Sequence, residues 1–404
     1  MQGGLHALVG VLAADLLWRE TWRWTVFLSV LPFVLWPFNG EATLWRAAGQ
    51  YPLAALLGLL GVQAIRRSSE QPTLSSITGP SLIALGVLTN QSAAFAGAVV
   101  WVFVVGLIVL SDAQIRIKRV RREAIMLVSG YCIGGVASFL IARLVGHPQL
   151  ASNILGKLVY LLHLNRLFIT WPEFYPPWLS AAHILLLSML SLVLVRAFRE
   201  KTWTIQQALL AITFIMTGLV TPYAAIVLVA QTWPAWRVMY LAPFLITGVV
   251  TILAQVLATW KVGRTVSLAL VSLILAGYVK MAWINSSEYV KVFEADLQLL
   301  RQLENYATRE HVQDGAIYVA TYPEAQIRNW NPYGLEYVHG DSKLPAFFRS
   351  WSAHPFVRRF SWLRPTQDTA IRAQCLDRCF LTMDKTGFRF YKLDAASAIC
   401  VCPP

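Results

Sequence analysis

The feature that most constrains this chain is a series of long apolar runs separated by short polar linkers. Each run is identified by its length and by the residues that flank it. They cover residues 5–17, 24–38, 52–65, 74–89, 93–110, 124–146, 178–196, 205–221, 239–259 and 265–284. An apolar helix of about 20 residues crosses the hydrocarbon core of a bilayer. The pattern therefore predicts an α-helical polytopic membrane protein with about ten transmembrane helices.

Composition agrees with a lipid environment. Only 14% of the 404 residues are charged, whereas soluble domains carry about 25%. The net charge of +13 does not indicate a nucleic-acid partner, because the basic residues form short clusters between apolar runs rather than one continuous face. The lipid bilayer is the partner that the composition favours.

Lys and Arg are concentrated in every second linker between the apolar runs. The basic linkers lie near residues 19–23, 66–67, 116–122, 196–201 and 261–264. The alternate linkers hold fewer basic residues, namely Arg46, Lys157, Arg166 and Arg237. Because basic residues stay on the cytoplasmic side, the first set is predicted to be cytoplasmic and the second external. Residues 1–285 then form a transmembrane domain, and residues 286–404 form an extracytoplasmic domain.

Cysteine supplies a second indication of orientation. Four of the five cysteines, Cys375, Cys379, Cys400 and Cys402, fall in the predicted external domain, where disulfides persist. Their C-x₃-C and C-x-C spacings differ from the usual spacing of zinc ligands, so disulfides are favoured and no metal is assigned. Three pairings are possible and remain open. Cys132 lies inside an apolar run and is predicted to be a small core residue.

The external domain is predicted to be a small α/β module. Residues 286–310 have the periodicity of an amphipathic helix, and 316–321 are predicted to be a strand. Segments 379–383 and 388–393 are predicted to form a hairpin around the turn 384–387. The segment 330–365, rich in Trp, Pro and Arg, has no regular period. It is interpreted as an irregular loop on the membrane surface, or as a surface that binds sugar or lipid headgroups.

Two predicted external loops carry candidate catalytic and binding residues. In the first, Glu41 and Arg46 are five residues apart. A carboxylate can take a proton from a sugar hydroxyl, and a guanidinium can bind a departing phosphate. The alternative is that both residues mark a helix end.

The second loop, 147–177, is long and includes Lys157, Arg166 and Glu173. Residues 151–169 are predicted to be a helix lying in the membrane interface, which would cover the headgroup of a lipid-linked substrate. A structural re-entrant segment is the alternative, and 222–232 is a second possible re-entrant stretch. His183, inside a run, is predicted to be a hydrogen-bonded core residue.

The run Pro37-Phe38, Glu41, Arg46 and Pro52 resembles the PF-x-x-E-x-x-x-x-R segment of bacterial Gtr-type (type II) O-antigen glucosyltransferases. Asn90-Gln91 stands where that family often has Tyr-Gln, and Trp283-Ile284-Asn285 leads into a helix much as in the family. This resemblance implies a GT-C-like membrane enzyme of the bacterial inner (plasma) membrane. Such an enzyme transfers a glycosyl unit, here glucose, from a polyprenyl-phosphate-linked sugar donor to O-antigen or a related glycan acceptor in the periplasm.

The motif assigns catalytic roles to Glu41 and Arg46, whereas Lys157, Arg166, Glu173 and Arg237 are assigned to substrate binding by position. No cofactor is implied. Members of the family usually begin with an extra span and a loop bearing an acidic pair, which this sequence lacks. We therefore expect the chain to be N-terminally incomplete, and whether it is a competent enzyme stays open. The alternatives are an O-antigen polymerase or ligase and a non-enzymatic lipid-linked sugar flippase or transporter.

Overall fold

The computed structural model describes most of the chain in two separate units. The described residues are 2–18, 23–36, 50–68, 75–111, 117–144, 154–170, 175–199, 217, 220–221, 240–257, 261–312, 316–320, 350–366, 368–381, 388–393 and 398–402. One unit, here called the helical unit, is Met1–Trp283, and the other, the α/β unit, is Ile284–Pro404. The division falls two residues before the predicted boundary at 285.

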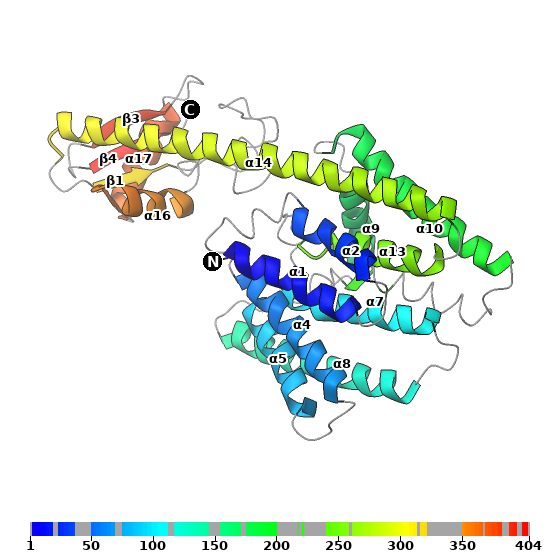
Figure 1. Ribbon diagram of the computed structural model, residues 1–404. Helices are drawn as coiled ribbons and strands as arrows, with labels where there is room; N and C mark the ends of the chain where they lie inside the picture. The colour runs from blue at the N-terminus through cyan, green and yellow to red at the C-terminus, as the bar shows by residue number, and fades with distance from the viewer. Residues whose placement is uncertain are drawn as a thin grey trace. The chain divides into compact units, whose positions relative to one another are not determined.

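Helices fill the apolar runs of the helical unit (Figure 1). They are α1 (Gln2–Trp18), α2 (Arg23–Leu35), α4 (Gln50–Ser68), α5 (Ser75–Thr89), α6 (Gln91–Ala94), α7 (Ala96–Ser111), α8 (Ile117–Leu144), α9 (Ile154–Thr170), α10 (Pro177–Arg199), α13 (Phe244–Val256) and the first part of α14 (Lys261–Arg309). The described parts of the predicted runs are mostly helical, with exceptions at Trp36, Phe95 and residues 240–243. The run 205–221 and the stretch 222–232 lie almost wholly outside the described residues.

Two of the described helices are long and apolar enough to cross a membrane, judged by length and composition alone. They are α8, over Arg119–Leu144, and α14. The described parts of five other apolar helices are shorter, at residues 4–17, 77–89, 91–107, 177–193 and 244–253. The helices that the apolar runs predict are therefore present, whereas the number of membrane crossings stays a prediction.

Small residues let the backbones of α4, α5, α7 and α8 approach closely. A Cβ atom added to Gly58 of α4 would collide with the carbonyl oxygen of Ala94 in α6. A Cβ added to Gly61 would lie 2.6 Å from Cγ1 of Ile83 in α5, and one added to Gly134 of α8 would lie 2.7 Å from the Cβ of Val87. An added methyl group would therefore meet a neighbouring helix at each of these glycines.

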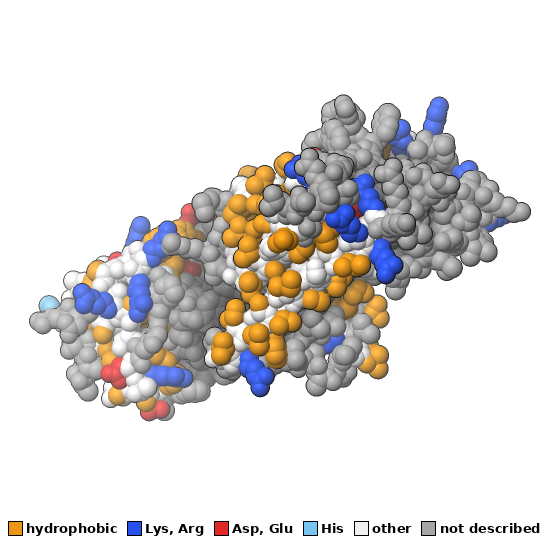
Figure 2. Space-filling model, turned by 90° about the horizontal axis from the view of Figure 1, so that it is seen from below, with side chains coloured by type: hydrophobic (Ala, Val, Ile, Leu, Met, Phe, Trp, Pro, Cys, Tyr) orange, Lys and Arg blue, Asp and Glu red, His pale blue; other side chains and the backbone are white. Residues whose placement is uncertain are grey.

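Much of the described outer surface of this unit is apolar, and α8 shows it most clearly. Its outward positions carry side chains that are 52–87% exposed: Ile125, Val128, Ile133, Val136, Leu140, Ile141 and Leu144. Hydrophobic side chains cover much of the described surface of the unit in Figure 2. Cys132 lies among them and is exposed, so its prediction as a core residue was wrong. The apolar run alone does not distinguish the inward face of α8 from the outward one.

The α/β unit contains the rest of α14, β1 (Ala316–Val319), α16 (Ser350–Phe360), β2 (Arg364–Pro365), α17 (Thr369–Leu381), β3 (Arg389–Leu393) and β4 (Ala398–Cys402). The four strands form one sheet in the order β2-β1-β4-β3. Strand β1 is parallel to both β2 and β4, whereas β3 is antiparallel to β4. Residues Leu299, Leu300 and Leu303 of α14 pack with β1, β4 and α16 in a buried core.

The helix predicted at 286–310 and the strands predicted at 316–321 and 388–393 are confirmed, but two predictions for this unit were wrong. Residues 379–381 end helix α17, and β3 pairs with β4 instead. Helix α17 follows Asp368, whose Oδ1 accepts hydrogen bonds from the backbone N–H groups of Ala370 and Ile371, as an N-cap residue does. The part of 330–365 predicted to be irregular contains helix α16; residues 330–349 lie outside the described residues.

Two disulfides join α17 to β4. The structure pairs Cys375 with Cys400 and Cys379 with Cys402, which is one of the three pairings that the sequence left open. The two helical cysteines are one turn apart, and the two strand cysteines are two residues apart, so each pair lies on one face of its element.

Candidate functional site

The ends of several helices of the helical unit meet in a cluster of aromatic rings. His6, near the start of α1, has its Nδ1 2.9 Å from the hydroxyl oxygen of Tyr240, which lies just before α13. The ring of Phe33, near the end of α2, lies 4.6 Å from His6 and 5.3 Å from Tyr240. Tyr51, at the start of α4, lies 5.8 Å from Tyr240. Helix α1 therefore begins at the end of the unit where α2 finishes and α4 starts.

A second group of buried rings continues this cluster. Trp36, directly after α2, donates its Nε1–H to the hydroxyl of Tyr175 at 3.1 Å and packs on Phe168 at the end of α9. His183 of α10 has its Nε2 2.8 Å from the hydroxyl of Tyr278 in α14. His183 is fully buried, so its prediction as a hydrogen-bonded core residue is confirmed.

We call this region the aromatic end of the helical unit. It is formed by His6, Phe33, Trp36, Tyr51, Phe168, Tyr175, His183, Tyr240, Phe244 and Tyr278. Hydroxyl and imidazole groups occupy a few positions among otherwise apolar side chains. Small-molecule sites have this character, with few polar groups among many apolar ones.

Four predicted site residues, Glu41, Arg46, Glu173 and Arg237, lie outside the described residues. The segments that contain them are 37–49, 171–174 and 222–239. The described flank of each segment belongs to the aromatic end. Trp36 precedes the first segment, Tyr175 follows the second, and Tyr240 follows the third. The contacts of these three flanking residues place all three of them at the same end of the unit.

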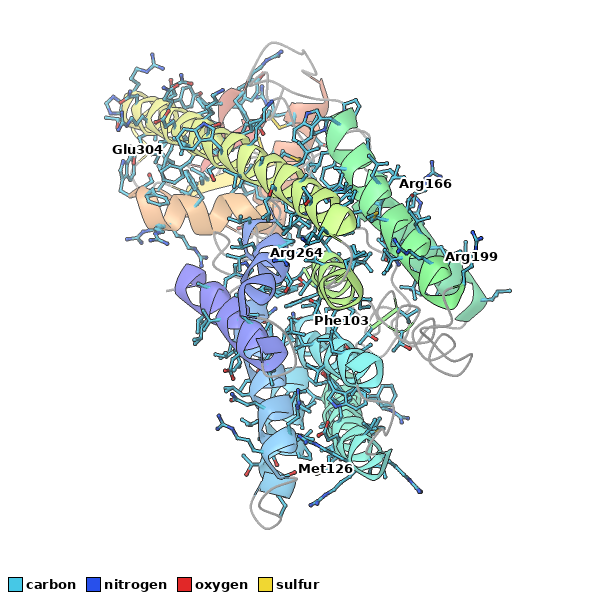
Figure 3. The ribbon with its side chains drawn as sticks, turned by 45° about the vertical axis from the view of Figure 1, so that its right-hand side comes forward. Phe103, Met126, Arg166, Arg199, Arg264 and Glu304 are labelled. Atoms are coloured by element: carbon cyan, nitrogen blue, oxygen red, sulfur yellow. A yellow bond between two sulfur atoms is a disulfide. The ribbon has the colours of Figure 1, made fainter. Side chains whose placement is uncertain are left out.

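Lys157 and Arg166 are described, and the structure does not bring them together. Nine residues separate them on α9, which places them on opposite faces of the helix. Lys157 is buried on the face that carries Leu161 and Phe168, and burial lowers the pKa of its ammonium group. Burial also raises the pKa of the neighbouring Tyr160 to about 12. Arg166 is exposed, and Figure 3 shows its side chain directed away from the neighbouring helices.

Charged side chains lie toward the end of α1 and near the start of α8. Asp15, near the end of α1, accepts a hydrogen bond from Gln63 of α4 at 3.0 Å. Glu123 of α8 is buried and pairs with Arg119 at 2.9 Å, while its second oxygen accepts from Trp101 Nε1.

Comparison with family models, with curated proteins and with solved structures found no match for this chain. The pairs that organise the aromatic end had no signal in the sequence, because their members are far apart in the chain. Positions His6 and Tyr240 are separated by 234 residues, and Trp36 and Tyr175 by 139. The one local hint was that aromatic residues border the predicted external loops.

Proposed function

We propose that the helical unit spans the bacterial inner membrane and transfers a glycosyl unit, glucose in the first instance, from a polyprenyl-phosphate-linked sugar to O-antigen or a related glycan at the periplasmic face. The reaction would take place at the aromatic end. The α/β unit would lie in the periplasm, a location that its two disulfides support because such bonds persist in an oxidising compartment.

One observation carries this proposal. Trp36, Tyr175 and Tyr240, which flank the three segments that contain the predicted site residues, lie together at the aromatic end although they are far apart in sequence. A donor with a polyprenyl chain, a phosphate and a sugar needs apolar contact, cationic groups and a carboxylate within one region. The exposed apolar side chains of α8 further support a lipid environment, since soluble proteins rarely expose so large an apolar surface.

The roles follow from the chemistry of each side chain. Glu41 would accept the proton of the attacking sugar hydroxyl as a general base. Arg46 would stabilise the departing polyprenyl phosphate through paired hydrogen bonds. Arg166, exposed on the outer face of α9, is suited to a phosphate or lipid headgroup, whereas buried Lys157 is suited to holding α9 in place.

The test is a transfer assay with the full chain in membranes, a radiolabelled glucosyl polyprenyl phosphate and purified O-antigen as acceptor. We expect Glu41→Gln to lower the transfer rate by about 10²–10⁴-fold and Arg46→Ala by about 10²–10³-fold. Arg121→Ala, an exposed position near the charged end of α8, is the matched control and should keep full activity. An unchanged glycan after deletion of the gene, or equal rates for all three variants, would reject the proposal.

A further inference from the structure

The four cysteines of the α/β unit form a compact sulfur cluster that goes beyond two independent cross-links. Cys375 and Cys379 face the sheet from α17, and Cys400 and Cys402 face the helix from β4. All four are buried, with at most 3% of each residue exposed. Their surroundings are apolar and include Tyr318, Ala320, Ile371, Leu393 and Ala398.

Sulfur atoms of different disulfides are in contact. The Sγ atom of Cys400 lies 3.5 Å from that of Cys379 and 3.7 Å from that of Cys402, although it is bonded to neither. The sulfurs of Cys375, Cys379 and Cys400 all lie within 4.8 Å of one another. In a tetrahedral zinc site the Zn–S bonds of about 2.3 Å place the sulfurs about 3.8 Å apart. Two contacts between the disulfides therefore already match the edge of such a tetrahedron, while Cys402 stands outside the group of three sulfurs that all lie within 4.8 Å of one another.

We propose that this cluster is a zinc site in its reduced form, with Cys375, Cys379, Cys400 and Cys402 binding one Zn²⁺ as four thiolates. Each disulfide takes two electrons and two protons from a dithiol reductant, which is itself oxidised to a disulfide. The four thiols then release their protons as Zn²⁺ binds. The α/β unit would thus have two cross-linked states. In one, two disulfides link α17 to β4, and in the other a bound metal ion does.

The fold explains why four thiols in this place would bind a metal. Two come from consecutive turns of a helix and two from alternate positions of a strand, so the elements that carry them are already formed and already face each other. Thiolates are unfavourable in an apolar interior unless a cation accompanies them. A single Zn²⁺ would also replace the link between α17 and β4 that reduction removes.

The experiment uses the full chain in detergent micelles with Cys132→Ser, which removes the exposed free thiol. The protein is reduced, freed of reductant under argon and titrated with Co²⁺, a spectroscopic probe for zinc sites. We expect one Co²⁺ per chain, with a sulfur-to-cobalt charge-transfer band that one equivalent of Zn²⁺ abolishes. The oxidised protein should give no band. The variant that combines Cys375→Ser with Cys400→Ser should bind at least about 100-fold more weakly.

Three outcomes would overturn the proposal. The first is a reduced protein with four alkylatable thiols and no charge-transfer band. The second is equal affinity in the urea-unfolded chain, which would mean that the fold contributes nothing. The third concerns refolding. If reduction unfolds the α/β unit, Zn²⁺ must restore its circular dichroism and protease resistance, and failure to do so also rejects the site. None of these measurements depends on glycosyl transfer.

Discussion

The two units of this protein differ in how many large apolar side chains one element exposes, and helix α8 and the sheet of the α/β unit show the contrast most clearly. In the helical unit, α8 exposes seven of them by 52–87% and buries the charged Glu123. In the α/β unit, Leu303, Ile317 and Val401 are fully buried around the sheet, and charged side chains such as Arg301 and Arg372 are exposed. The first pattern suits hydrocarbon as solvent and the second suits water. We therefore propose that one chain meets two solvents, with the change falling within α14.

The units also differ in what holds their elements together. Close approach at glycines joins helices α4, α5, α7 and α8, a form of packing that is common where lipid offers no hydrophobic driving force between helices. The small α/β unit has a limited core and adds two disulfides to it. A change at the glycine contacts should therefore affect the helical unit alone, and loss of a disulfide should affect the α/β unit alone.

Loss of the disulfide between Cys375 and Cys400 should have the largest effect on stability. Replacing Cys375 and Cys400 by Ser opens a loop with a sequence separation of 25 and should cost the α/β unit about 2–5 kcal/mol. The helical unit should be unaffected. Limited proteolysis followed by mass mapping would detect new cleavage sites after residue 284 alone. Equal loss of resistance in both units would show that they do not fold separately.

A charge on the apolar face of α8 should have the next largest effect. Ile133 is 60% exposed, so Ile133→Asp would cost little in water but about 2.5–3.5 kcal/mol in a bilayer. Gln298→Asp, at an exposed position of the α/β unit, is the control and should be neutral. The amount of protein in the membrane fraction measures the difference. Equal amounts for both variants would mean that α8 faces water.

Adding one methyl group tests the close packing of the helical unit. Gly58→Ala would collide with the carbonyl oxygen of Ala94 and should cost about 1–3 kcal/mol. Gly135→Ala is the matched control, because a Cβ there meets nothing within 4 Å. Thermal unfolding in detergent reports the difference. Equal melting temperatures would contradict the close approach of α4 to its neighbours.

The smallest expected effect on stability comes from a substitution at the aromatic end. Trp36→Phe keeps a ring against Phe168 but removes the donor to Tyr175, and it should cost about 0.5–1.5 kcal/mol. Transfer activity should fall by more than this loss of stability explains, because the bond joins the flanks of two segments assigned to the site. Activity that falls only in proportion to the folded fraction would count against that role.

Local patterns in the sequence predicted the elements well. Apolar runs predicted the helices, because each run is contiguous, and periodicity predicted the helix at 286–310. The short apolar stretch at 379–381 misled, because a buried strand and a helix end look alike over so few residues. Asp368, eleven residues earlier, was a capping signal for a helix.

Long-range features could not be predicted in this way. Sequence spacing allows three equivalent pairings for the four cysteines of the α/β unit, and nothing local selects Cys400 as the partner of Cys375. Nor does any spacing indicate that His6 lies beside Tyr240. Of the site residues predicted from sequence, Lys157 and Arg166 are described. Both were assigned to substrate binding because they lie in one predicted loop, but they lie on opposite faces of α9.

The central claim is that the helical unit crosses a membrane with the α/β unit on the external side, and thiol accessibility tests it most directly. In the Cys132→Ser background, Gln298→Cys and Arg121→Cys place single thiols on the α/β unit and near the start of α8. A membrane-impermeant maleimide is then applied to intact spheroplasts and, separately, to lysed ones. We predict labelling of position 298 in both and of position 121 only after lysis. Labelling of 121 but not 298 in intact spheroplasts would contradict the account.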